Sequence, residues 1–71
     1  MTMTVAEKLR LIMKRNKMTM SDLAEKSGQT RQNLSNKMSR NNFTEKDIIT
    51  LAECLGCTVD IVFRLPDGSE L

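Results

Sequence analysis

The residues of this chain that could do chemistry gather in one short, mostly polar segment, RQNLSNKM. Arg31, Gln32 and Asn36 belong to it, and such side chains can form paired hydrogen bonds with the edge of a base pair. Its apolar anchors are Leu34 and Met38, four residues apart. A helix of this composition leaves most of its surface for something other than the protein core. We therefore predict that Arg31, Gln32 and Asn36 contact bases in the DNA major groove. The alternative is that they are ordinary polar residues of a helix surface.

The flanking residues predict two short helices joined by a tight turn. Thr19 is a favourable N-cap for the first helix, and Asp22 follows at the capping-box spacing. Gly28 stands after this helix, where a left-handed backbone is needed, and Thr30 caps the second helix. The pattern predicts a helix-turn-helix over about residues 19–39.

Further polar residues on or near these helices are candidates for contacts with the DNA backbone. The N-termini of the two helices that Thr19 and Thr44 are expected to cap would add backbone N–H donors and favourable dipoles. Asn33 has the alternative role of contacting a base. The candidates for backbone contacts are Thr19, Thr30, Asn33, Lys37, Arg40 and Asn42.

The charge of the chain is small in total but unevenly distributed. The net charge of the 71 residues is +2, yet residues 8–46 alone carry +7 and residues 47–71 carry −4. The basic part coincides with the predicted helix-turn-helix. A solvated basic surface is the simplest explanation, but this coincidence favours a polyanionic partner.

Two more helices are expected on either side of the helix-turn-helix. Thr4 and Glu7 form a T-x-x-E start, and apolar residues at helical spacing follow it. Thr44 with Asp47 predicts the start of the last helix, and Gly56 its end. The apolar faces of these helices contain Val5, Leu9, Ile12 and Met13, and Ile48, Leu51, Ala52 and Leu55.

In these features the chain resembles the phage repressor and Cro family, also called XRE-type. The resemblance covers roughly residues 5–62 and rests on Ala24, Gly28, Thr30, Leu34 and the segment LAECLG. It implies a mainly α, four-to-five-helix repressor-like DNA-binding domain that works as a homodimer.

The chain departs from the family pattern at three places. Met20 stands where the family often has a phosphate-binding Gln, so backbone N–H groups are expected to replace that contact. Met13 and Met38 stand where some repressors bury an Arg–Glu pair, so we expect an apolar contact. Lys37 replaces an aliphatic anchor, and its stem could cover the core edge while its ammonium group reaches a phosphate.

The cysteines do not indicate catalysis or metal binding. Cys54 and Cys57 form a C-x-x-C, but the chain has no His and no other Cys to complete a zinc site. The sequence has no nucleophile–base pair, acid pair or metal cluster. We therefore expect no enzyme activity, no cofactor and no metal.

In the C-terminal segment 59–65 one set of residues is entirely apolar, and it alternates at a period of two with a second set of Asp60, Val62 and Arg64. The apolar set is Val59, Ile61, Phe63 and Leu65, and a Pro-Asp-Gly turn follows. This pattern favours a strand, with a short fifth helix as the alternative. We expect one face of the strand to pack on the core, and residues 58–71 to pair with a second subunit as a dimerisation tail. A hairpin or an arm folded on its own core is the other possibility. The expected dimer contacts are Ile61, Val62, Phe63 and Leu65.

Taken together, residues 1–71 are expected to form one domain that binds double-stranded DNA sequence-specifically as a small transcriptional regulator. No segment has the length of a signal peptide or a membrane span, so we expect a cytoplasmic protein without a membrane partner. Two alternatives stay open. One is an antitoxin-like protein that also binds a toxin, and the other is a protein-interaction module that does not bind DNA.

Overall fold

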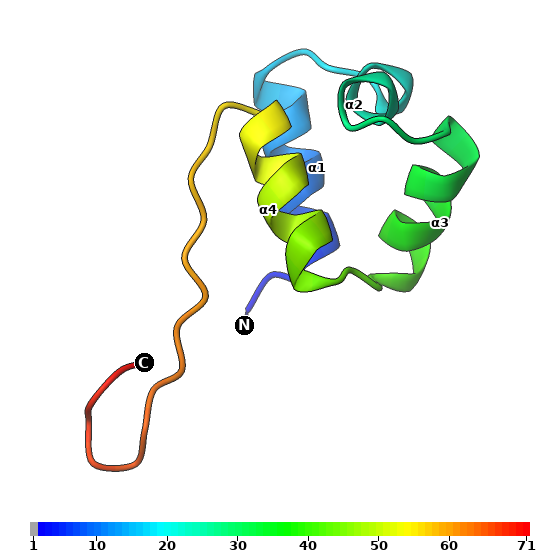
Figure 1. The fold of residues 1–71 in the computed structure, drawn as a ribbon. Coiled ribbons are helices and arrows are strands. Elements are labelled where there is room, and N and C mark those ends of the chain that lie inside the picture. The colour runs from blue at the N-terminus through cyan, green and yellow to red at the C-terminus, as the bar shows by residue number, and fades with distance from the viewer. Residues whose placement is uncertain (1) are drawn as a thin grey trace.

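The computed structural model describes residues 2–71, which contain four helices and a C-terminal arm (Figure 1). The helices are α1 (Val5–Arg15), α2 (Met20–Lys26), α3 (Arg31–Arg40) and α4 (Glu45–Cys54). The mainly α fold class predicted from the sequence is confirmed. The short fifth helix that was the alternative for the tail is not found in these residues.

Each helix begins at the threonine that the sequence marks as its N-cap. In every case the threonine hydroxyl accepts a hydrogen bond from the backbone N–H three residues later. In α1, α2 and α4 a carboxylate returns the contact to the backbone of the cap, which completes a capping box. Gly28 and Gly56 follow α2 and α4 with φ of 72° and 74°, a left-handed conformation that glycine adopts without steric cost.

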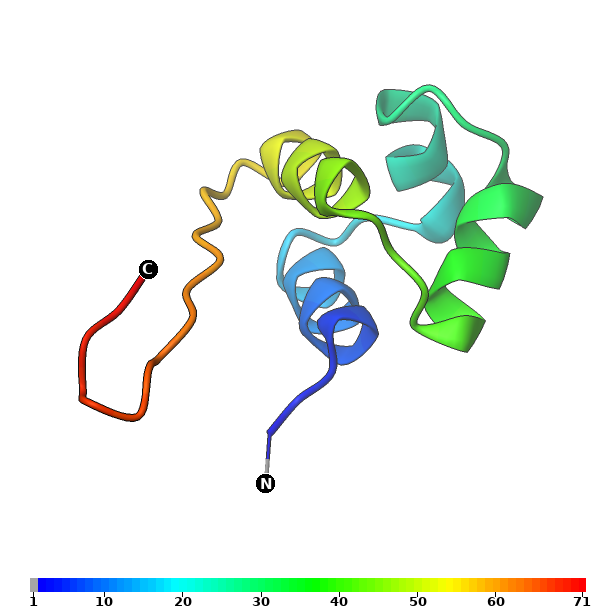
Figure 2. The same ribbon diagram turned by 60° about the horizontal axis from the view of Figure 1, so that its bottom comes forward.

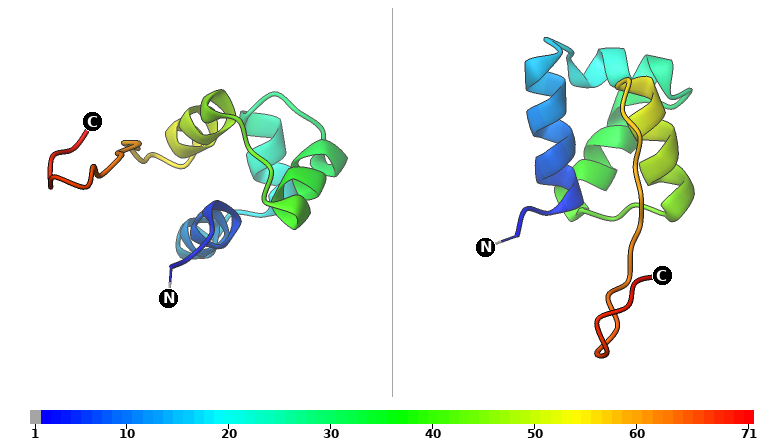
Figure 3. Two further views of the ribbon diagram at one scale, coloured as in Figure 1. Left: turned by 90° about the horizontal axis from the view of Figure 1, so that it is seen from below. Right: turned by 90° about the vertical axis from the view of Figure 1, so that its left-hand side faces the viewer.

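The helices are arranged so that α3 lies at one side of the molecule. In Figures 1 and 3, α1 and α4 run in the same direction and α2 lies across their carboxyl-terminal ends. Helix α2 packs against both α3 and α4, and α1 packs against α3. The helix-turn-helix is therefore supported from behind by α1 and α4, and the outer side of α3 is free.

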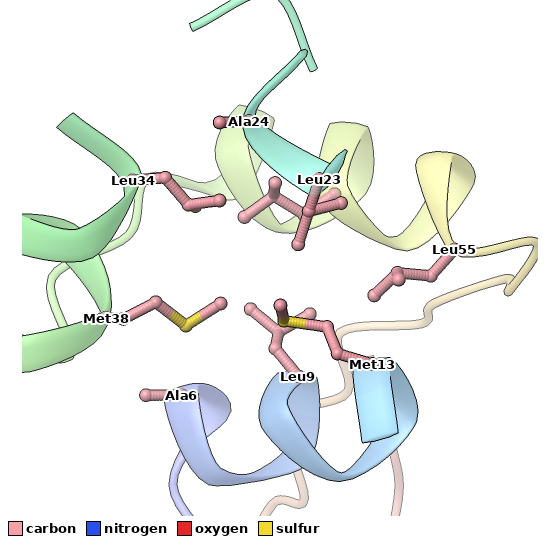
Figure 4. Close-up of a cluster of buried hydrophobic side chains, with 9 residues drawn as sticks. Ala6, Leu9, Met13, Leu23, Ala24, Leu34, Met38 and Leu55 are labelled. Carbon is pink, nitrogen blue, oxygen red and sulfur yellow. The ribbon is translucent and has the colours of Figure 1, made fainter. Parts of the chain in front are cut away.

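A small apolar core joins all four helices. Leu23, Leu34 and Leu51 are at most 1% exposed and form its centre. Met13 and Met38 belong to the same cluster, and Figure 4 shows their side chains pointing toward one another from α1 and α3. Both methionines are therefore buried in one cluster, as the predicted apolar contact between them requires. No charged or polar residue in the described range 2–71 is buried.

The arm corrects the prediction for the C-terminal tail. After α4, residues 57–61 line a hollow together with residues of α1 and α4, and the rest of the arm projects away from the helices (Figure 2). The arm forms no regular strand over residues 59–65. The prediction that one face of this segment packs on the core is wrong, because Ile61 is 47% exposed and Phe63 is 68% exposed.

The arm forms no regular strand because few residues of its own chain can pair with it. Only residues 69–71 are available, and they pair with residues 63–65 at the tip of the arm. Phe63 N–H donates to the Leu71 carbonyl at 2.7 Å, and Leu65 N–H donates to the Ser69 carbonyl at 2.8 Å. This short hairpin pairs the backbone at the tip of the arm within the arm itself.

Candidate nucleic-acid interface

The turn between α2 and α3 is held by buried anchors and by hydrogen bonds of Ser27. Leu23, Ala24 and Leu34 are buried beneath the turn, which fixes how α3 sits on α2. The Ser27 hydroxyl donates to the Leu23 carbonyl at 2.8 Å, and Gln29 N–H donates to the Ala24 carbonyl at 3.0 Å. These contacts present the first turn of α3 at the surface.

The three predicted base-contacting residues lie together on the exposed part of α3. Arg31, Gln32 and Asn36 are all exposed. The Gln32 side-chain amide donates to the Asn36 side-chain oxygen at 3.4 Å, as expected for residues one helical turn apart. The structure thus brings Gln32 and Asn36 together and leaves Arg31 exposed in the first turn of the same helix. We call these three exposed side chains the α3 surface.

Asn33 is held by residues that sequence reasoning missed. Its side-chain amide donates to the Gln29 side-chain oxygen at 3.1 Å, and the Gln29 amide donates to the Ser27 hydroxyl at 2.9 Å. Gln29 lies before the N-cap of α3, outside the helical periodicity. Only knowledge of the turn conformation places it beside Asn33. The chain of hydrogen bonds fixes the direction in which the Asn33 side chain points.

The expected backbone-contacting residues of α3 and the following loop line a shared hollow of about 330 Å³. Among these residues Lys37 already has a partner, because its Nζ lies 2.9 Å from Oδ1 of Asp47 on α4. The sequence marked Asp47 only as a capping residue. Its role as the partner of Lys37 was missed. The hollow is lined by Asn33, Asn36, Lys37, Arg40, Asn42, Thr44 and Asp47.

The two remaining candidates, Thr19 and Thr30, are exposed N-caps of α2 and α3. Neither lines the hollow. The Thr30 hydroxyl accepts from Asn33 N–H at 3.0 Å, and the Thr19 hydroxyl accepts from Asp22 N–H at 3.1 Å. Their side chains therefore stabilise the helix starts, whatever further contact they make.

The four helix starts in residues 2–71 differ in charge. Asp22 accepts the Thr19 N–H and Asp47 accepts the Thr44 N–H, both at 3.0 Å, so these two backbone donors are already occupied. The backbone hydrogen bond from the cap holds the pKa of each carboxyl below its ordinary value. By contrast, α3 has no acidic residue in its first turn. Its dipole is not offset by a carboxylate, which suits an anionic partner.

Two asparagines outside the predicted site fix its frame. Asn41 ends α3 in a left-handed conformation with φ of 50°, and its side-chain oxygen accepts the Ala6 N–H of α1 at 3.0 Å. Asn16 donates from its side chain to the Leu55 carbonyl at 3.2 Å. The first contact ties the end of α3 to α1, and so positions Arg40 and the loop behind it.

Other kinds of site find no support within the described residues. Cys54 and Cys57 are free, partly buried thiols. Across residues 2–71 there is no group of three or more side chains that could hold a metal ion. Among the helices of this same range, none has the length and hydrophobicity of a membrane span.

Comparison with known proteins identifies the family. A family model described as a Cro/C1-type helix-turn-helix DNA-binding domain matches residues 8–66, which include the whole of α2, the turn and α3. No curated protein and no solved structure matches the chain significantly. The family match spans most of the chain and agrees with the resemblance seen in its sequence. The chain belongs to the Cro/C1-type helix-turn-helix family of DNA-binding domains.

Proposed function

We propose that this protein is a sequence-specific transcriptional regulator that inserts α3 into the major groove of double-stranded DNA. The observation that carries the proposal is the α3 surface, where Arg31, Gln32 and Asn36 are exposed beside a helix start without acidic residues. A guanidinium group can pair with guanine, and side-chain amides can pair with adenine.

The hollow beside α3 supplies contacts to the DNA backbone in this proposal. Arg40 and Asn42 lie at the end of α3 and in the loop that follows, next to the groove-facing residues. Such contacts position the helix on the duplex without selecting its sequence. Thr19 and Thr30 are proposed to contact phosphates at the starts of α2 and α3.

We further propose that the protein acts as a homodimer held together by the arm, residues 58–71. Ile61, Val62 and Phe63 are 47%, 46% and 68% exposed, and Leu65 is 38% exposed, which is unusual for side chains of this size. Pairing with the arm of a second copy would cover them and satisfy free backbone groups. A dimer would place two α3 helices on half-sites about 34 Å apart.

Selection of bound sequences from a random DNA pool tests the function directly. The proposal predicts enrichment of a palindromic site whose half-sites are about one helical turn apart. A single half-site would contradict the dimer and leave sequence-specific binding intact. If no sequence is enriched, the protein is not a sequence-specific regulator. The same arm could then serve a different protein partner, as in an antitoxin.

A further inference from the structure

The ion pair between Lys37 and Asp47 is partly shielded from solvent. The side chains are 25% and 21% exposed, and their charged atoms are 2.9 Å apart. The other ion pair in residues 2–71, Arg64–Glu70, lies on the arm with side chains 82% and 56% exposed. Because solvent and salt screen exposed pairs most strongly, the α3–α4 pair is the stronger of the two.

Asp47 is the fixed partner of the pair. Its Oδ2 accepts the Thr44 N–H at 3.0 Å, and its own N–H donates to the Thr44 hydroxyl at 3.0 Å. The Thr44 backbone and Lys37 both lower the pKa of the Asp47 carboxyl, which keeps it negatively charged at neutral pH. Lys37 is the mobile partner, since its ammonium group is on a flexible stem.

The surroundings of the pair are those of a phosphate contact. Lys37 and Arg40 line the hollow together with asparagine and threonine side chains, and Asp47 is the only carboxylate among the lining residues. A DNA phosphate offers what Asp47 already offers, which is negative charge and acceptor oxygens. The carboxylate and a phosphate placed in the hollow would therefore compete for the same ammonium group.

We propose that Asp47 competes with the DNA phosphates for Lys37, and so lowers the affinity of the protein for every DNA sequence. This inference rests on the proposed docking of α3. On DNA binding, Lys37 must exchange the carboxylate for a phosphate, and part of the gain from the new contact is lost in breaking the old one. Of the three base-contacting candidates, Asn36 lines the hollow and Arg31 and Gln32 do not. The exchange at Lys37 involves a phosphate and no base, so we expect discrimination between sequences to be unchanged.

The test compares Asp47→Asn with the wild type by fluorescence anisotropy, using the selected duplex and an unrelated duplex. Asparagine removes the charge and can still accept the Thr44 N–H. We expect the variant to bind both duplexes about fivefold more tightly at low salt, the magnitude of one partly exposed ion pair. The slope of log affinity against log salt concentration should stay close to that of the wild type, because Lys37 contacts a phosphate in the complex of either protein.

Glu45→Gln is the matched control, because Glu45 carries the same charge in the first turn of α4 and is exposed. Its effect should stay below about twofold at the same salt concentration. The variant Lys37→Met keeps an apolar stem and removes the ammonium group. In this variant, adding Asp47→Asn should raise the affinity for DNA no more than Glu45→Gln does.

The outcomes separate this inference from the proposed function. A gain that persists without Lys37, or that Glu45→Gln equals, would show general charge repulsion and overturn the inference. Unchanged or weaker binding by Asp47→Asn would overturn it as well. In that case the proposed function still stands if the wild type binds the selected duplex. A wild type that binds neither duplex overturns both. Circular dichroism verifies folding, and Asp47→Gln replaces Asp47→Asn if that variant unfolds, since Gln also completes a capping box.

Discussion

Replacing Met38 with glutamate should strongly destabilise the fold, because Met38 is an anchor of α3 in the core. Its side chain is 2% exposed and lies in the apolar cluster with Leu9 and Met13. The cluster contains no cationic side chain to pair with a carboxylate. The glutamate must therefore stay buried and unpaired, become protonated, or force α3 away from α1.

The expected loss of stability can be worked out from this environment. An uncompensated buried charge costs about 3–5 kcal/mol. A chain of 71 residues is expected to have a total stability of about 4–10 kcal/mol. A loss of 3 kcal/mol lowers the melting temperature of a domain this small by about 12 °C or more. The conservative variant Met38→Leu should cost less than about 1.5 kcal/mol.

Thermal and urea unfolding followed by circular dichroism would measure both variants. A melting temperature of Met38→Glu within about 4 °C of the wild type would place Met38 at the surface. The register of α3, and with it the assignment of Arg31, Gln32 and Asn36 to the exposed side, would then be wrong. Adding Met13→Arg to Met38→Glu should restore part of the stability, since the two side chains point toward one another (Figure 4).

Three further predictions concern binding, assembly and pH. Gln32→Ala should weaken binding to the selected site by about 1–3 kcal/mol and relax the preference at one base pair, whereas Lys37→Met should weaken all sequences similarly. Equal losses on specific and random DNA for both variants would refute this assignment, as measured by anisotropy. Removing residues 62–71 should give a monomer with weak operator binding but nearly wild-type thermal stability, because Phe63 is exposed; light scattering that finds the full chain monomeric at tens of micromolar would refute the arm-mediated dimer. The Thr19 backbone lowers the pKa of Asp22 from its ordinary value of 3.8. The capping contact of Asp22 therefore stabilises the fold fully above that pH, and this stabilisation is lost as the pH falls through the lowered pKa of the folded state. The stability difference between wild type and Asp22→Ala, from urea unfolding, should therefore shrink below pH 3.8, and a difference that grows there would contradict the capping role.

The helix starts could be predicted because the signals are local. In α1, α2 and α4 the threonine and its partner carboxylate are three residues apart, so the capping geometry needs no knowledge of the rest of the fold. The polar surface of α3 was predictable for the same reason, since Leu34 and Met38 fix which side of the helix is buried.

Contacts between elements could not be predicted in this way. Lys37 and Asp47 meet only because the loop after α3 turns back and brings the start of α4 beside its last turn. The arm shows the opposite limit. Its sequence shows a strongly apolar segment, but periodicity does not say whether the core, the chain itself or another molecule covers the apolar residues.

The most direct test of sequence-specific DNA binding through α3 is a salt titration of binding to the selected duplex. If a dimer neutralises about six phosphates, affinity should fall on the order of 10³-fold between about 50 and 200 mM salt. The selected duplex should also stay well above random DNA in affinity throughout. Binding that is insensitive to salt, or equal for both duplexes, would contradict the claim that α3 contacts bases from a surface anchored on DNA phosphates.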